Sequence, residues 1–106
     1  MNLPPMNRVS DKFRRTLLQV ATHCRVEPSD ILSTSRKREH VLPRQLFQWL
    51  LVKDHGMDPS AIATRYATKR TGIYHNVKRI DDLLSARDAL IVCHLAALRS
   101  DKTKAA

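Results

Sequence analysis

The 106-residue sequence predicts an all-α domain, a compact bundle of five to six helices. Only two glycines occur in the chain, whereas an all-β protein of this length needs many glycine-rich turns. Apolar residues make up 42% of the sequence, and many of them recur every three or four residues, as on the buried face of a helix. A chain of this length buries one small core, so we expect a single domain over residues 10–100.

The first helix is expected to begin at Ser10 or Asp11, because either side chain can cap the free N–H groups of a first turn, and to end near Arg25. Residues 1–9, which include two prolines, are expected to form a flexible lead, and residues 101–106 a polar tail. The apolar stripe of this helix consists of Phe13, Leu17, Val20, Ala21 and Cys24.

The middle of the chain contains a short turn, a basic arm and a strongly apolar helix. Pro28 suits the first position of a helical turn that carries Ile31 and Leu32 toward the core. Residues 34–40 have no apolar period, so we expect a basic arm there. Residues 44–55 are apolar on nearly all sides, which places this helix and its aromatic residues, Phe47 and Trp49, at the centre of the bundle. Gly56 is its expected end.

Three more helices are expected after Gly56. Asp58 as N-cap and Pro59 at the first position start a short helix that reaches about Tyr66, which we expect to pack inward. A break over residues 67–70 separates it from the next helix. The inner stripe of that helix consists of Ile73, Val77, Ile80 and Leu84, and the stripe of the last helix of Leu90, Ile91, Leu95 and Leu98.

The charge of the chain is large and unevenly distributed. The formal net charge is +9, which favours binding to nucleic acid or another anionic surface. Residues 36–79 hold ten basic side chains against three acidic ones, whereas residues 81–106 hold four of each. No segment is apolar enough to span a membrane, so we expect a cytoplasmic, nucleoid-associated protein without a membrane partner.

The segment 59–79 has the features of a helix-turn-helix, in which the second helix enters the major groove of DNA. The outer face of residues 69–79 contains no acidic residue, whereas a surface selected only for solubility mixes charges of both signs. A binding face therefore explains it better than a solvated surface does. The expected contact residues of this face are Lys69, Arg70, Thr71, Tyr74, His75, Lys78 and Arg79.

A second group of basic side chains precedes the central helix. Arg36, Lys37 and Arg38 lead directly into it, so cationic groups are held at a fixed place on a rigid element. Such an arrangement suits a polyanion.

These segments resemble the C-terminal DNA-binding domain of the bacterial replication initiator DnaA, a helix-turn-helix fold like that of Trp repressor. Residues 35–45 are similar to that domain's arm and helix start, and residues 28–32 to the turn before it. Residues 59–66 and 73–80 are similar to its helix-turn-helix, and the whole resemblance runs from about residue 16 to residue 99. It implies binding to double-stranded DNA.

The resemblance also implies roles for individual residues. Arg36 matches the family's minor-groove arginine, Arg44 and Gln45 match residues that contact phosphates, and Lys69 matches the signature arginine of the turn. Pro59 lies in the matching segment of the first helix of the motif. Before the second helix, however, the family has Gly-Gly-Arg-Asp-His-Ser/Thr-Thr, and residues 67–72 are one residue shorter and lack the Asp-His pair. Because base contacts specify the site, we expect a different target sequence.

No phosphate-binding loop and no nucleophile motif occur in the sequence, so we expect no enzyme and no cofactor. The expected action is site occupancy, as a regulator of replication or transcription. The alternative is a protein-interaction module that binds an acidic partner, such as a replication or transcription protein, through the same basic face. RNA is a third candidate ligand, disfavoured because single-strand readers usually present exposed aromatic platforms. We expect a monomer or weak dimer.

Two cysteines and two adjacent histidines raise the question of a zinc site. His23 with Cys24, and Cys93 with His94, supply four ligand atoms, but neighbouring residues on a helix point about 100° apart. We therefore expect Cys24 and Cys93 to be reduced thiols in the core, with partly exposed histidines and no metal.

Overall fold

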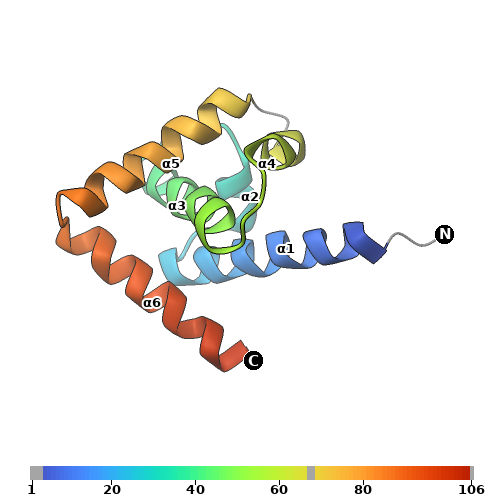
Figure 1. Ribbon diagram of the computed structural model, residues 1–106. Helices are drawn as coiled ribbons and strands as arrows, with labels where there is room; N and C mark the ends of the chain where they lie inside the picture. The colour runs from blue at the N-terminus through green and yellow to red at the C-terminus, as the bar shows by residue number, and fades with distance from the viewer. Residues whose placement is uncertain (1–3, 67–68, 106) are drawn as a thin grey trace.

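The computed structural model describes residues 4–66 and 69–105, with side chains for residues 11–65 and 69–100. In these residues it contains six α-helices and no strand, which confirms the all-α prediction (Figure 1). The helices are α1 (Pro4–Cys24), α2 (Pro28–Leu32), α3 (Arg38–Trp49), α4 (Pro59–Tyr66), α5 (Arg70–Ser85) and α6 (Ala89–Ala105), and a π-helical segment, η1 (Leu50–Asp54), continues α3.

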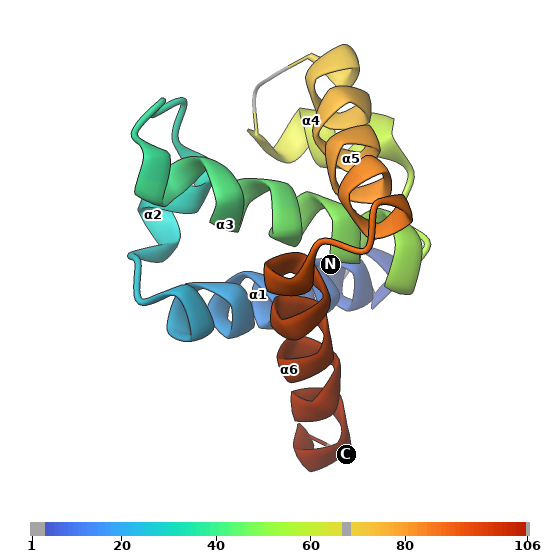
Figure 2. The ribbon, with the colours of Figure 1, turned by 90° about the vertical axis from the view of Figure 1, so that its left-hand side faces the viewer.

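Helix α3 lies at the centre of the bundle, as predicted. Leu46, Phe47 and Leu51 are fully buried, and α1, α2 and α5 all pack against α3, with α1 also packing against η1 (Figure 2). The Phe47 ring meets the Phe13 ring of α1 edge-to-face, with centroids 5.1 Å apart. Trp49 is also buried, so the two aromatic residues of α3 belong to the core.

The start of α3 differs from the prediction. We expected a non-helical arm up to residue 40, because residues 34–40 have no apolar period. The helix begins instead at Arg38, with the Lys37 carbonyl accepting hydrogen bonds from the N–H groups of His40 (2.9 Å) and Val41 (3.1 Å). Pro43 lies inside the helix, where it removes one ladder hydrogen bond, and its ring is buried. Burial of the ring offsets part of that loss.

The two ends of the chain are also more helical than predicted. Helix α1 begins at Pro4 rather than at Ser10 or Asp11, since the first turn of a helix tolerates proline, whose missing N–H has no partner there. Helix α6 continues to Ala105, past the expected polar tail at residue 101. The division into a lead, a domain of residues 10–100 and a tail stays a prediction.

The connection from η1 to α4 is formed as predicted. The His55 N–H bonds to the Leu50 carbonyl (3.1 Å), and Gly56 then turns the chain with a φ of 64°, in the left-handed region that favours glycine. Asp58 caps α4 by accepting the N–H of Ser60 on its Oδ1 (3.2 Å), and Pro59 is the first helical residue.

The inner stripes of the last two helices are partly as predicted. Ile73, Val77 and Ile80 of α5 are buried, and so are Ile91, Leu95 and Leu98 of α6. Leu90 is 70% exposed, because a helix turns about 100° per residue and Leu90 cannot share a face with Ile91 and Leu95. Cys93 is exposed for the same reason, so the prediction of a core thiol was wrong there. Cys24 is half-buried, and this burial raises the pKa of its thiol.

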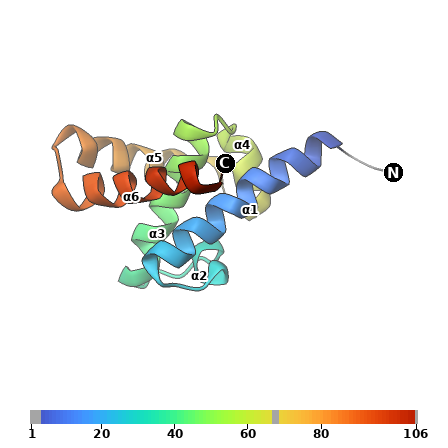
Figure 3. The same ribbon diagram turned by 90° about the horizontal axis from the view of Figure 1, so that it is seen from below.

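Polar contacts attach α6 to the rest of the bundle. Arg99 donates two hydrogen bonds to the Asp54 carboxylate (2.8 and 3.0 Å), and its guanidinium lies 5.0 Å from the centroid of the Trp49 ring. The Gln19 side chain donates to the Leu98 carbonyl (2.8 Å). His23 of α1 and His94 of α6 face each other, with His23 Nε2 2.9 Å from His94 Nδ1. In the view from below, α1 and α6 lie toward the viewer (Figure 3).

The histidine pair predicts that stability falls in acid. Burial and the neighbouring His23 ring lower the pKa of His94 below its usual value of 6.5, so the folded state takes up its proton less readily than the unfolded state. The stability that the neutral His94 ring contributes is therefore complete above about pH 6.5 and is lost as the pH falls below it. Between about pH 7.5 and about pH 5.5, we expect the Tm of the wild type to fall further than that of His94→Gln, measured by circular dichroism. Identical falls in the two proteins would contradict this role of the pair.

Candidate nucleic-acid interface

Two exposed basic segments lie on one side of the molecule. One is the α2–α3 arm, residues 33–37, together with the first residue of α3, and the other is the N-terminal half of α5. Figure 2 shows both at the side opposite α1, with α3 between them and α1. Arg36, Lys37 and Arg38 are exposed, as expected for side chains that contact a ligand.

The α2–α3 arm has a defined conformation because serine side chains replace the missing helical hydrogen bonds. Ser33 Oγ donates to the Asp30 carbonyl (2.8 Å) and accepts the N–H of Ser35 (3.1 Å). Ser35 Oγ accepts the N–H of Lys37 (3.2 Å) and lies 2.9 Å from His40 Nδ1. The backbone on both sides of Arg36 is thus held, while the Arg36 side chain stays exposed.

Arg44 of α3 is half-buried and reaches back to the α2–α3 arm. Its guanidinium donates to the carbonyls of Asp30 (3.0 Å), Ile31 (2.9 Å) and Ser35 (2.8 Å), and lies 3.4 Å from Ser33 Oγ. The sequence did not predict these contacts to the arm. The phosphate contact expected of Arg44 stays a prediction.

A chain of side-chain amides joins α3 to α5. Asn76 Nδ2 donates to Gln48 Oε1 (2.8 Å), and Gln48 is only 2% exposed, so this bond satisfies a buried polar group. Gln45 Nε2 lies 3.5 Å from Asn76 Oδ1, which makes Gln45 a half-buried residue at the edge of the interface. Sequence reasoning gave Asn76 no role, although its place beside the apolar stripe of α5 was a usable signal. These contacts fix how α5 lies across α3.

The outer face of α5 is exposed as predicted. Lys69 is extended and immediately precedes the helix, and Arg70 Nη1 bonds to Ser60 Oγ of α4 (3.3 Å), which ties the two helices of the motif together. Lys78 pairs with Asp82 one turn later (3.2 Å), in an exposed pair that contributes little and can open. The remaining exposed residues of this face are Thr71, Tyr74, His75 and Arg79.

Some of the predicted residues are not exposed on the candidate interface, and others lie outside the residues that the structure describes. Pro59 is half-buried at the start of α4. Residues 67 and 68, where the turn departs from the DnaA pattern, and the side chain of Tyr66 lie outside the described residues. Lys12, Arg14 and Arg15 of α1 are also exposed, so basic side chains occur on the opposite side as well.

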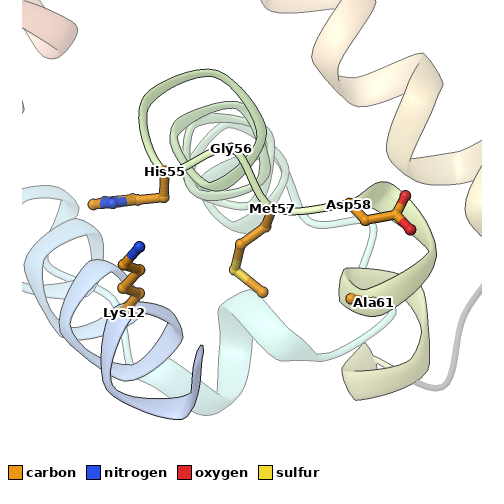
Figure 4. A pocket seen from close by; sticks show the side chains of 6 residues that line it. All are labelled: Lys12, His55, Gly56, Met57, Asp58 and Ala61. Carbon is orange, nitrogen blue, oxygen red and sulfur yellow. The ribbon is translucent and has the colours of Figure 1, made fainter. Parts of the chain in front are cut away.

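A hollow of about 290 Å³ lies between α1 and the loop before α4 (Figure 4). Its lining includes Lys12, His55 and Asp58, so it selects neither sign of charge.

In the described part of the chain, no three His, Cys, Asp or Glu side chains form a group that could hold a metal ion. None of the described helices combines the length and the apolar character that crossing a membrane requires.

The segment from α1 to α5 matches a known family. The model of the bacterial dnaA protein helix-turn-helix matches residues 15–80. The chain belongs to this DnaA family. A curated relative, the chromosomal replication initiator protein DnaA of Kosmotoga olearia, is 34% identical over 56 residues, which are 53% of this chain and 12% of the relative. The chain therefore matches only a small part of that DnaA protein. No solved structure matches.

Membership in the DnaA helix-turn-helix family confirms the resemblance and the fold class. The matched segment is a DNA-binding helix-turn-helix and not a catalytic domain. It includes both candidate segments, since the α2–α3 arm and the outer face of α5 lie within residues 15–80.

The buried hydrogen bond between Asn76 and Gln48 predicts that substitutions of these two residues do not have additive effects on stability. Asn76→Leu leaves the Gln48 amide without its partner, and we expect the free energy of unfolding to fall by about 1–3 kcal/mol in urea titrations. Replacing both partners, Gln48→Leu with Asn76→Leu, removes the orphaned group and is expected to recover most of the loss. A double variant whose loss equals or exceeds the sum of the two single losses would contradict this.

Proposed function

We propose that this protein binds double-stranded DNA at selected sequences and acts by occupying its site, as a regulator of replication or transcription. The main support is that two exposed basic segments lie on one side of a DnaA-family domain, each held by a rigid helix. The proposed location is the nucleoid in the cytoplasm.

In this proposal α5 is the recognition helix and enters the major groove, which is about 12 Å wide and accommodates an α-helix. Its N-terminal residues approach the DNA first, and these are Lys69, Arg70 and Thr71. Tyr74 and His75 follow, and Tyr74 is 54% exposed although it is a large aromatic residue. Lys78 and Arg79 are close enough to the start of the helix to reach phosphates.

The α2–α3 arm is proposed to reach the adjacent minor groove. Arg36 is the proposed reader, because a narrow A-T-rich groove concentrates negative potential that attracts an inserted guanidinium. Lys37 and Arg38 stand next to it and are proposed to contact phosphates, as is Gln45. The start of α4 at Pro59 is proposed to present the positive end of that helix dipole to a phosphate.

The alternative is a module that binds an acidic protein through the basic face, with α6 as a second contact surface. Leu90 and Val92 of α6 are large apolar residues with 70% and 46% of their surface exposed. Capture of a protein partner that survives nuclease treatment, without any shift of duplex DNA, would replace the DNA proposal with this one.

Removing single charges tests the proposed surface. Arg70→Ala is expected to weaken duplex binding about tenfold and to lower the salt dependence by about one phosphate contact, a slope change of about 0.9. The matched control is Arg15→Ala on α1, which removes the same charge from the opposite side and is expected to change affinity by less than about twofold. Fluorescence anisotropy at several salt concentrations measures both. Equal losses of affinity in the two variants would mean that the overall positive charge of the protein attracts DNA, without a defined surface.

Base composition tests the role of Arg36. Selection from a random duplex pool first gives the preferred site, and its A-T-rich flank is then replaced by G-C pairs. Arg36→Ala is expected to weaken binding to the original site about tenfold and to leave the G-C version nearly unchanged. A loss of the same size on both duplexes would assign Arg36 to phosphate contact alone.

A further inference from the structure

Arg44 lies at the junction of α3, α2 and the α2–α3 arm, and its guanidinium donates to three backbone carbonyls. Two of its hydrogen bonds go to the carbonyls of Asp30 and Ile31, at 3.0 and 2.9 Å, and a third goes to the carbonyl of Ser35 at 2.8 Å. All three acceptors lie 9 to 14 residues before Arg44 in the chain. The guanidinium therefore joins the core helix to the segment that carries Arg36.

The geometry of α2 explains why a guanidinium is needed there. The last carbonyls of a helix have no partner within it, and α2 has only five residues. A basic side chain near the end of a helix satisfies such carbonyls. Arginine presents five donors in a planar fork, so it can serve acceptors on several sides at once, whereas lysine is a compact point charge.

Ser35 is held from a second direction. His40, on the first turn of α3, lies with Nδ1 2.9 Å from Ser35 Oγ and with Nε2 3.4 Å from the Asp30 carboxylate. Ser35 is thus held at its carbonyl by Arg44 and at its hydroxyl by His40. Since Arg36 is the next residue, its starting direction is set by these contacts.

We infer that Arg44 is a positioning residue that acts on DNA through the α2–α3 arm, by presenting Arg36 in a fixed place, and that it is not primarily a phosphate contact. This inference rests on the proposed function. An arm that must first be ordered loses backbone freedom on binding, which weakens affinity by about tenfold for each residue ordered. A preorganised arm avoids that loss.

The first experiment needs no DNA. The α2–α3 arm and the start of α3 contain three consecutive trypsin sites, Arg36, Lys37 and Arg38. Arg44→Lys keeps the charge and the number of trypsin sites but cannot serve all of these acceptors. We expect cleavage after residues 36–38 to be about tenfold faster in Arg44→Lys than in the wild type, well below the Tm of both proteins. Arg15→Lys on α1 is the matched control and is expected to leave the rate unchanged.

The second experiment measures DNA binding by the same variants. Arg44→Lys is expected to lose the preference for the A-T-rich duplex as Arg36→Ala does, about tenfold, while its salt dependence stays at the wild-type value. If Arg44 contacts a phosphate directly, lysine replaces it with little loss, while Arg44→Met lowers the slope by about 0.9. That result, or unchanged cleavage of the arm, would overturn the inference.

Ser35→Ala tests the inference if Arg44→Lys does not fold. It removes the hydroxyl that His40 and the Lys37 N–H contact and leaves Arg44 in place. We expect Ser35→Ala to speed tryptic cleavage of the arm and to weaken the preference for the A-T-rich duplex, each by less than Arg44→Lys does. A wild-type protein that binds no duplex would overturn the proposed function, whereas the cleavage rates decide separately whether Arg44 holds the arm.

Discussion

Burial of α3 is the constraint on which the rest of the structure depends. Leu46, Phe47 and Leu51 have no exposed surface, so α1, α2 and α5 must enclose this helix to remove them from water. The α2–α3 arm leads into the start of α3 and is also joined to it through Arg44, and α5 packs against α3. One rigid element therefore sets the relation between the two segments. A protein that reads two grooves of one duplex needs this relation to be fixed.

The sequence predicted the helices better than their ends. Apolar spacing reports which side of a helix is buried, and it identified α1, α3, α5 and most of α6. Gly56 and Asp58 were predicted well because their effects are local. The start of α3 was missed because its first three residues, 38–40, are polar and add nothing to the apolar period from which the helix was predicted.

The sequence predicted which residues of the candidate interface are exposed but not the hydrogen bonds that hold them in place. Exposure of Arg36 and of the outer face of α5 followed from charge and period alone. The contacts of Arg44 depend on where the α2 carbonyls lie in space, which no spacing along the chain reports. Asn76 was missed because its partner, Gln48, lies 28 residues away. Sequence patterns thus find surfaces, whereas the hydrogen bonds that orient them require the fold.

The most direct test of the account is to follow backbone amide signals by NMR while a selected duplex is added. We expect the largest shifts at residues 35–38 and 69–79, on the two segments that lie on one side of α3, and smaller ones at Gln45 and the start of α4. Signals from the exposed faces of α1 and α6 are expected to stay in place. Shifts concentrated on α6, or the same small shifts over all exposed basic residues including Arg15, would contradict it.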